Sequence, residues 1–300
     1  MLSPPTDTVD DTQAARDFQP DPVDMNYRHA FHAGNFADVA KHLALVSIVS
    51  HLKKKEQAFA VIDTHAGRGL YSIAGEASER TGEAANGIGR LGALHDAPGA
   101  LGEYLAVARS FGDGLYPGSP LITAKLLRPQ DRLIAIEKHP DEAEALKQNL
   151  RQWRIATAET ADGYARLAAV LPPKERRGFV LIDPPFEAED EFAQAARAFA
   201  AAYRRFATGI YLLWFPVKLA SAAEAFGGEI LAAGAKKVLR IDVSIAPVSS
   251  DGKERLGTAG LIIVNPPFGM SEEMQTALGE IVPRLGPGSE FRQRWLAGPG

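Results

Sequence analysis

The sequence contains no cysteine among its 300 residues, so it forms neither a disulfide nor a thiolate metal site. It also lacks any uncharged apolar run of about 18 residues, the length that a membrane span requires. No secretory signal opens the chain, and we expect a cytoplasmic protein with no membrane contact. The hydrophobic fraction of 46% is ordinary, and it suffices for the core of one large α/β domain.

A strong excess of charge of one sign is missing as well, since the formal net charge is −4. Residues 1–24 carry six acids and one base, a net charge of −5, so the other 276 residues carry about +1. This balance neither supports nor excludes an RNA partner. Residues 1–24 are rich in Pro, Asp and Thr and have no apolar period, which predicts a disordered acidic tail before a functional domain over 25–300.

The most informative stretch is Val180-Leu181-Ile182-Asp183-Pro184-Pro185-Phe186. Proline cannot donate to a sheet ladder, so the predicted strand ends at Asp183 and leaves its carboxylate where open α/β sheets bind ligands. Methylation of a planar exocyclic amine needs such groups: Asp183 and the Pro184 carbonyl would each accept one N–H, and Phe186 would stack on the base. An ordinary Asp-Pro turn is the alternative.

Seven predicted strands alternate with helices, which indicates a doubly wound α/β sheet. The first, Phe59–Asp63, leads into the glycine loop Thr64–Gly69, where glycines let the backbone approach a nucleotide. Ser72 replaces the third glycine of a dinucleotide fingerprint, which weakens a dehydrogenase interpretation. The other strands are expected at 133–137, 156–160, 180–183, 209–216, 237–245 and 260–265, with a small helical subdomain inserted at about 73–116.

The last two strands lack an intervening helix, so they are expected to form an antiparallel hairpin. This matters because Asn265-Pro266-Pro267-Phe268 repeats the pattern that follows the fourth strand. If the last strand runs antiparallel to the others, Asn265 lies at the opposite edge of the sheet from Gly67. We therefore expect Asp183 to be the functional copy.

A polar and aromatic segment, Met25–His42, precedes the first strand. Apolar residues at spacings of three and four from Phe36 predict a helix to about Leu52, with Asn35 as its N-cap. Four side chains in and near it could suggest a metal site: His29, His32, Asp38 and His42. Their spacing matches no standard ligand set, so we expect the lining of a ligand cleft and no metal, with Lys41 placed to meet an anion.

Polar residues also end the second and third predicted strands. Glu137 is suited to bind two ribose hydroxyls, the alternative being an exposed strand-end acid, and Asp162-Gly163 would lie beside an adenine ring. Several basic groups could contact RNA, although each cluster is more simply a solvated face: Arg28, Lys53, Lys54, Lys55, Lys174, Arg176, Arg177, Arg204, Arg205, Lys236 and Lys237. Of these, Arg28 adjoins the predicted site.

With these motifs placed, the chain resembles class I S-adenosylmethionine-dependent methyltransferases, and more narrowly the RlmJ family, which methylates N6 of an adenine in 23S ribosomal RNA. The resemblance covers nearly everything after residue 25. It rests on the Tyr27–His42 segment, supported by Asp63–Gly67, Tyr116–Pro120 and Asp183–Pro185. Phe186 stands where the family usually has Tyr, so stacking is kept but a hydroxyl contact is lost. The acidic tail has no expected counterpart.

The resemblance implies S-adenosylmethionine as cofactor, with Asp183, Pro184 and Phe186 at the reacting amine and Tyr27, together with Arg28, on the RNA side. It places these residues around the cofactor, together with Gly67 of the glycine loop: Lys41, His65, Ser119, Glu137, Asp162 and Gly163. The expected substrate is 23S ribosomal RNA, protein-free or in an early assembly intermediate, bound by a monomer. The alternatives are a DNA adenine methyltransferase, for which no sizeable target-recognition domain is available, and a non-catalytic RNA-binding module that retains the nucleotide pocket.

Overall fold

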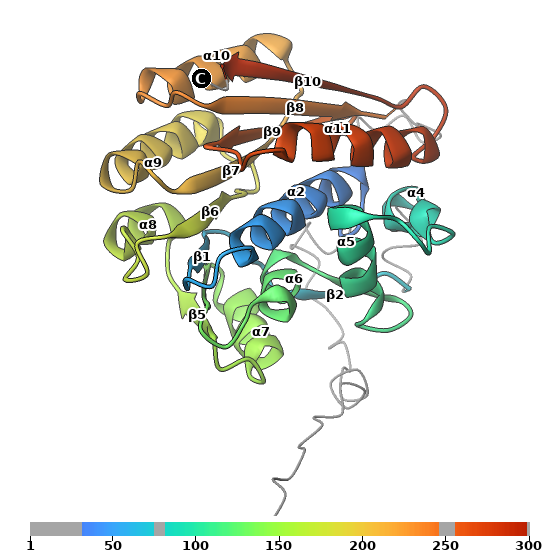
Figure 1. Ribbon diagram of the computed structural model, residues 1–300, viewed down its shortest axis with the longest axis horizontal. Coiled ribbons are helices and arrows are strands. Elements are labelled where there is room, and N and C mark those ends of the chain that lie inside the picture. The colour runs from blue at the N-terminus through green and yellow to red at the C-terminus, as the bar shows by residue number, and fades with distance from the viewer. Residues whose placement is uncertain (1–31, 75–81, 246–255, 299–300) are drawn as a thin grey trace, which may run out of the picture.

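The protein is described from a computed structural model, which places residues 32–74, 82–245 and 256–298. Its central feature is one sheet of eight strands (Figure 1). The strand order is β10 (Glu290–Ala297), β8 (Val238–Ser244), β9 (Thr258–Val264), β7 (Ile210–Pro216), β6 (Gly178–Ile182), β1 (Ala60–Asp63), β4 (Arg132–Glu137) and β5 (Ala156–Thr160).

The strands from β7 to β5 are parallel to one another, whereas β9 is antiparallel to both β7 and β8. The predicted doubly wound fold with a terminal antiparallel hairpin is therefore confirmed. The predicted number of strands was wrong, because β10 adds an eighth strand beside β8. Phe291 and Trp295 lie on the same face of β10 and pack against the core, which explains why this edge strand forms.

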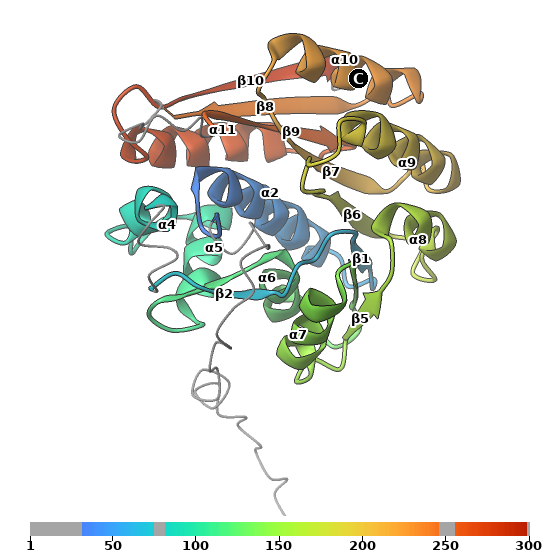
Figure 2. The ribbon, with the colours of Figure 1, turned by 180° about the vertical axis from the view of Figure 1, so that it is seen from behind.

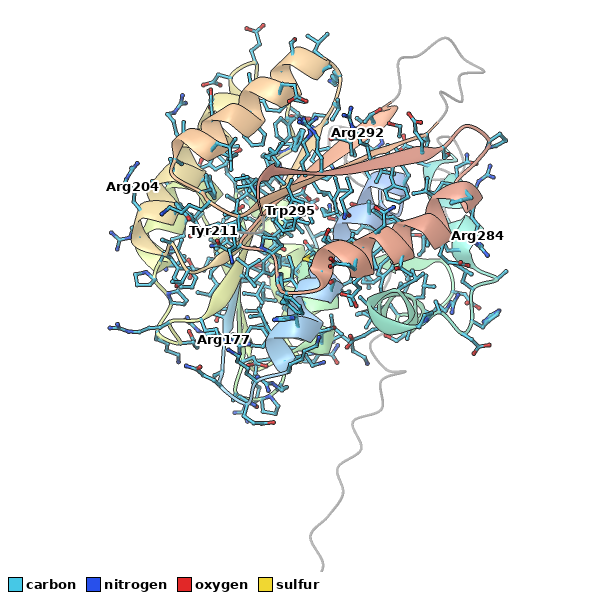
Figure 3. All side chains as sticks on the ribbon, turned by 45° about the horizontal axis from the view of Figure 1, so that its top comes forward. Arg177, Arg204, Tyr211, Arg284, Arg292 and Trp295 are labelled. Carbon is cyan, nitrogen blue, oxygen red and sulfur yellow. The ribbon has the colours of Figure 1, made fainter. Side chains whose placement is uncertain are left out.

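Helices cover both faces of the sheet and bury its apolar side chains in two clusters (Figures 1 and 2). One face carries α2 (Phe36–Lys53), α5 (Gly99–Arg109), α6 (Ser119–Leu126), α7 (Pro140–Leu150) and α11 (Met270–Ile281), which continues into the short η3 (Val282–Arg284). The other face carries α8 (Gly163–Val170), α9 (Glu191–Arg205) and α10 (Ala220–Ala232). Figure 3 shows side chains filling these layers, among them the fully buried Tyr211.

Helix α2 lies across the sheet and is buried along almost its whole length, since α5, α6 and α11 cover its outer side. Its predicted N-cap is confirmed: the Asn35 side-chain oxygen accepts hydrogen bonds from the backbone N–H groups of Ala37 and Asp38, both at 2.9 Å. The cap fixes where the first turn begins, and therefore the position of Asp38 and Lys41 over the sheet.

The segment between β1 and α6 contains α4 (Glu83–Asn86), the short helix η2 (Ile88–Leu91) and α5. It also contains an unpredicted two-stranded antiparallel sheet, which consists of β2 (Leu70–Ser72) and β3 (Leu115–Pro117). Helix α5 packs on α2 within the same core cluster. The boundaries of an inserted subdomain and of an acidic tail remain predictions.

The second Pro-Pro motif lies at the far edge of the sheet, as the antiparallel hairpin predicted. Val264 is paired with Tyr211 at the start of β7, so Asn265 follows at the edge where the parallel strands begin. Its side-chain nitrogen donates to the carbonyls of Ala207 and Gly209, at 2.9 and 2.8 Å, so it holds the turn before β7. Among the described residues, no helix is long and apolar enough to cross a membrane.

Candidate active site

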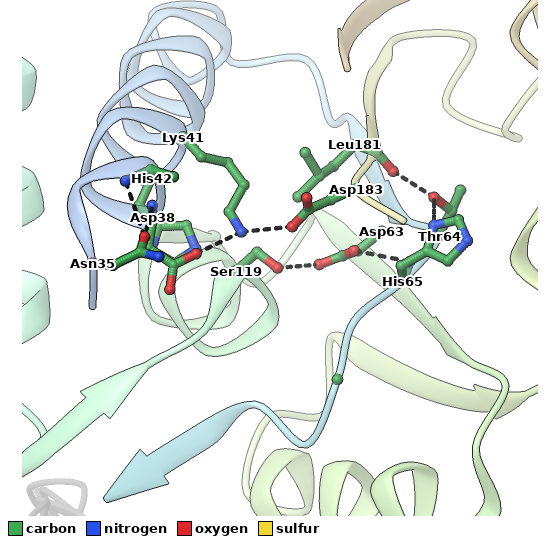
Figure 4. A network of polar contacts seen from close by, with 12 residues as sticks. Asn35, Asp38, Lys41, His42, Asp63, Thr64, His65, Ser119, Leu181 and Asp183 are labelled. Carbon is green, nitrogen blue, oxygen red and sulfur yellow. Dashed lines mark hydrogen bonds and ion pairs between the residues drawn. The ribbon is translucent and has the colours of Figure 1, made fainter. Parts of the chain in front are cut away.

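The site forms at the carboxyl end of β6, where Asp183 meets a lysine from α2 (Figure 4). Lys41 Nζ donates to Asp183 Oδ2 at 2.5 Å and to Asp38 Oδ1 at 2.7 Å, and its side chain is almost fully buried. Lys41 therefore meets an anion, as its place on the helix predicted, and that anion is the carboxylate of the central motif. One oxygen of Asp183 is held, and the other is left to accept from a ligand.

The electrostatics of this trio favour its ionised form. Burial by itself lowers the pKa of Lys41, but the charges of Asp183 and Asp38 outweigh it and raise the pKa well above its usual range. Lys41 is therefore a fixed cation and no proton shuttle at neutral pH. Asp38 is fixed in turn, because its Oδ2 accepts from the backbone N–H of Gly34 at 2.9 Å.

A second buried carboxylate, Asp63, ends β1 next to this trio (Figure 4). Ser119 Oγ donates to Asp63 Oδ2 at 2.6 Å, which links the start of α6 to the glycine loop. Burial raises the pKa of Asp63 from 3.8 to about 7, although the Ser119 hydrogen bond lowers it. In the sequence, Asp63 was a predicted strand end and the start of the Asp63–Gly67 motif, and neither feature indicated its shifted pKa.

The loop after β1 contacts the strand-end acid of β4. The backbone N–H of Gly67 donates to Glu137 Oε2 at 2.8 Å, and the N–H of His139 donates to Oε1 at 2.7 Å. Gly67 has φ of +60°, and a Cβ there would meet the Tyr71 hydroxyl at 2.3 Å, so only glycine fits. Glu137 keeps free lone pairs on both oxygens, which suits it to accept from the hydroxyls of a ribose.

The tip of β5 lies against the same loop. A Cβ on Gly163 would meet the Thr64 carbonyl oxygen at 2.0 Å, so the start of α8 approaches this loop as closely as backbone allows. Asp162 caps α8 by accepting from the N–H of Ala165 at 3.1 Å and pairs with Lys138 at 3.0 Å. The Lys138 hydrogen bond, acting against partial burial, lowers the pKa of Asp162 and keeps its carboxylate ionised.

Aromatic rings border the site on both sides of Asp183. Burial lowers the pKa of His65 to about 4, so this ring is neutral, and it meets the Tyr164 ring edge-on with centroids 4.8 Å apart. Phe186 has φ of +51° and lies 4.7 Å from Phe192 and 5.8 Å from Trp214 between ring centroids. Trp214 is adjacent to Asp183 in register, because Leu213 pairs with Ile182.

Most of the residues singled out in the sequence lie along the carboxyl edge of the parallel strands, although they come from α2, α6 and four strand ends: Lys41, His65, Gly67, Ser119, Glu137, Asp162, Gly163, Asp183, Pro184 and Phe186. Tyr27 and Arg28 lie outside the described residues. Sequence reasoning missed Trp214, Tyr164 and the ionic role of Asp38. Trp214 precedes Phe215-Pro216, a strand end that could have indicated it. Within the described ranges, no three His, Asp or Glu side chains form a metal-binding group.

Taken together, this strand order and these strand-end groups define a Rossmann-like class I methyltransferase fold. The carboxyl edge carries a glycine loop after β1 and an acid after β4, with the acid-Pro-Pro-aromatic turn after β6.

The comparisons then identify the family within this class. A family model described as "Ribosomal RNA large subunit methyltransferase D, RlmJ" matches residues 56–297, and the chain belongs to this family. The chain is 40% identical over 267 residues to two proteins named Ribosomal RNA large subunit methyltransferase J, from Haemophilus influenzae and Escherichia coli. These matches cover 87% and 88% of this chain, and 92% and 95% of the two relatives. A crystal structure of a Legionella pneumophila protein is 31% identical with a TM-score of 0.81, covering 88% of this chain and 98% of that one.

Proposed function

We propose that this protein is a ribosomal RNA methyltransferase that transfers a methyl group from S-adenosylmethionine to N6 of an adenine in 23S ribosomal RNA. The observation that carries the proposal is the Asp183 carboxylate at the end of β6, fixed by the buried Lys41 and followed by Pro184 and Phe186. The names of the relatives support ribosomal RNA as the substrate class. We further propose that the protein acts as a monomer in the cytoplasm.

The residues supply positioning rather than a strong base. An exocyclic amine is a poor nucleophile because its lone pair is delocalised into the ring. The free oxygen of Asp183 and the Pro184 carbonyl each accept one N–H, which turns the lone pair out of the ring plane. Phe186 stacks on the flipped base, a contact worth roughly 1–3 kcal/mol. Lys41 fixes one oxygen of Asp183 by a hydrogen bond, which leaves the other oxygen to accept from the amine.

The donor and acceptor set fits the proposed cofactor. When bound, S-adenosylmethionine supplies an electrophilic methyl group on a sulfonium. Glu137 would hold the ribose hydroxyls of the cofactor, and Asp162 and Gly163 would border its adenine. Because Gly67 has no side chain, the backbone of the glycine loop could approach the bound cofactor closely. The acidic side chains of Asp183 and Glu137 at this edge would favour a cationic sulfonium.

A test offers labelled methyl donor to wild-type protein and to Asp183→Ala, with protein-free ribosomal RNA and duplex DNA as parallel substrates. We expect label in N6-methyladenine of the RNA, and a fall in kcat of at least about 100-fold in Asp183→Ala with cofactor binding kept. Asn265→Ala, in the second Pro-Pro motif, is the control and should keep the wild-type kcat.

Other outcomes would assign a different function. Label only in DNA would mean a DNA adenine methyltransferase, and cofactor binding with no transfer to either polymer would indicate a non-catalytic module. Full activity in Asp183→Ala would remove Asp183 from the mechanism.

A further inference from the structure

A band of basic side chains follows the edge of the sheet where the parallel strands begin, opposite Asp183. We call it the basic rim; it consists of Lys54, Lys55, Arg151, Arg154, Lys174, Arg176, Arg204, Arg205, Lys236 and Lys237. These side chains lie in the segments that precede β1, β5, β6, β7 and β8, and all ten are exposed. Within the described ranges, none of the ten forms an ion pair with an acid, so their charges are available to a partner.

Two further arginines fasten neighbouring segments of this edge together. The guanidinium groups of Arg128 and Arg177 lie 5.7 and 5.6 Å from the centroid of the Phe59 ring. Arg177 donates to the carbonyl of Gln57, and Arg128 donates to the carbonyl of Lys55. Burial, with the charge of the neighbouring Arg128, lowers the pKa of Arg177, which reflects how closely cations are crowded here.

The acids at this edge are fewer than the ten cations of the basic rim. Asp131 pairs with Arg128 at 2.9 Å and Glu175 pairs with Arg132 at 2.9 Å, which leaves the exposed Glu56 beside Lys55. The opposite edge is more acidic at its surface. After Asp183 it exposes Glu187, Glu189 and Asp190, of which Asp190 pairs with Arg197. The described surface that follows Asp183 therefore favours phosphates less than the basic rim does.

An aromatic ring stands at the same edge. Phe268 is 97% exposed, and it lines a cleft together with Ser50, His51 and Lys54 of the end of α2. Burying this ring against another surface would be favourable, and an exposed ring beside Lys54 is suited to stack on an unpaired base, although Glu273 also lines the cleft. The antiparallel β9 places it here, because its end meets the beginnings of the parallel strands.

We propose that the basic rim, with Phe268, is a docking surface for the phosphate backbone of a folded RNA, remote from the adenine that is methylated. The proposal rests on ribosomal RNA being the substrate. Strands of five to seven residues separate the two edges, which is roughly 15–25 Å before the loops are added. Only an RNA that extends around the molecule reaches both. A membrane is disfavoured, because Phe268 is the one large apolar side chain that the described part of this edge exposes.

The test compares two triple charge reversals with the wild-type protein. The rim variant is Arg176→Glu, Arg204→Glu and Lys236→Glu. The control is Lys147→Glu, Arg284→Glu and Arg292→Glu, three exposed residues of α7, η3 and β10 with the same change in charge. Figure 3 shows Arg204 on the flank that also carries Arg177, away from Arg284 and Arg292. KM and kcat are measured on a full-length 23S ribosomal RNA transcript and on the shortest fragment of it that the wild type methylates.

For the rim variant we expect KM for the full-length transcript to rise about tenfold or more at 0.1 M salt, with kcat unchanged. The slope of log KM against log salt should fall by about two to three, one for each lost phosphate contact. KM for the shortest fragment should stay within about twofold, and the control triple should match wild type on both RNAs. Phe268→Ala should raise KM about fivefold or more without changing the slope.

Several results would overturn the inference. One is that KM of the rim variant for the full-length transcript equals that of the control triple. Another is that KM of the rim variant rises by the same factor on the transcript and on the shortest fragment. Loss of binding to vesicles of anionic lipid, with unchanged KM for the transcript, would identify a membrane as the partner instead. If the wild type transfers no methyl group, the proposed function fails separately. Filter binding of the same transcript then tests whether the basic rim binds RNA. An unchanged affinity in the rim variant would reject the docking surface.

Discussion

At the residue scale, the site depends on one buried lysine that joins α2 to the end of β6. Lys41 contacts Asp183 and Asp38 through the same nitrogen, so two carboxylates share one cation away from water. The sequence predicted that Lys41 would meet an anion. It could not indicate which one, because Asp183 is 142 residues away and the pairing arises only when α2 packs across the sheet.

Replacing Lys41 with Met should leave the carboxylates of Asp38 and Asp183 without the cation that they share in a buried site. Breaking a buried pair in this way costs about 3–5 kcal/mol of unfolding free energy, which a urea titration measures. Lys41 also fixes the position of the Asp183 carboxylate, so the kcat of the variant should fall by about tenfold or more. Adding Asp38→Asn removes one of the two like charges and should recover part of the lost stability. An unchanged kcat in Lys41→Met would exclude this role for the lysine.

Asp63 and His65 should give stability two opposing dependences on pH. The folded pKa of Asp63, about 7, lies above its unfolded value, so its contribution to the unfolding free energy falls as pH rises from 4 to 7. The folded pKa of His65, about 4, lies below its unfolded value, so its contribution is present above pH 6.5 and is lost as pH falls. In the wild-type protein the two contributions therefore oppose each other.

Single variants separate the two effects. Between pH 4.5 and 7.5, the stability of wild type relative to Asp63→Asn should fall by on the order of 2–4 kcal/mol, and relative to His65→Gln it should rise by on the order of 1–3 kcal/mol. Urea unfolding at several pH values gives both differences. Parallel curves for all three proteins would show that neither group has the stated charge in the folded state.

At the element scale, the sequence predicted those helices and strands whose hydrophobic pattern agreed with the residues that begin and end them. The helix from Phe36, strand β1 and the strands from β4 to β9 followed from apolar runs ended by Gly, Pro or an acid. Strand β10 was missed because it is an edge strand with charged residues at alternate positions, such as Arg292 and Arg294. The antiparallel pair of β2 and β3 was missed because each strand is three residues long and 42 residues lie between them, so local pattern cannot pair them.

The start of α8 offers a test of close packing between elements. Gly163→Ala places a methyl group 2.0 Å from the Thr64 carbonyl oxygen, so α8 or the glycine loop must move. We expect a loss of about 1–3 kcal/mol of stability and a weaker cofactor affinity, since both elements border the proposed cofactor site.

The matched control is Gly228→Ala in α10, where a Cβ meets nothing within 4 Å. This variant should gain about 0.5–1 kcal/mol, because alanine is the better helix former. Thermal unfolding and titration with S-adenosylmethionine measure both quantities. Equal behaviour of the two variants would mean that the approach of α8 to Thr64 does not matter to the site.

At the scale of the whole molecule, the chain separates its charges in a way that its composition conceals. A net charge of −4 describes neither edge of the sheet, since cations gather where the parallel strands begin and carboxylates where they end. Each basic cluster could be found in the sequence, and each was more simply a solvated face. Only the strand order brings the segments that precede β6, β7 and β8 to one edge, so the combined surface is a property of the fold.

This separation predicts how salt affects the wild-type reaction. If net charge governed encounter with RNA, a protein of charge −4 would bind no worse as salt rises. If the basic rim displaces counterions from several phosphates, log KM for full-length 23S ribosomal RNA should rise against log salt with a slope of about 3 or more between 50 and 200 mM. The KM for S-adenosylmethionine, measured at saturating RNA, is the internal control and should change less than about twofold. A flat or falling KM for RNA would mean that the segregated cations do not meet the substrate, whatever the chemistry at Asp183.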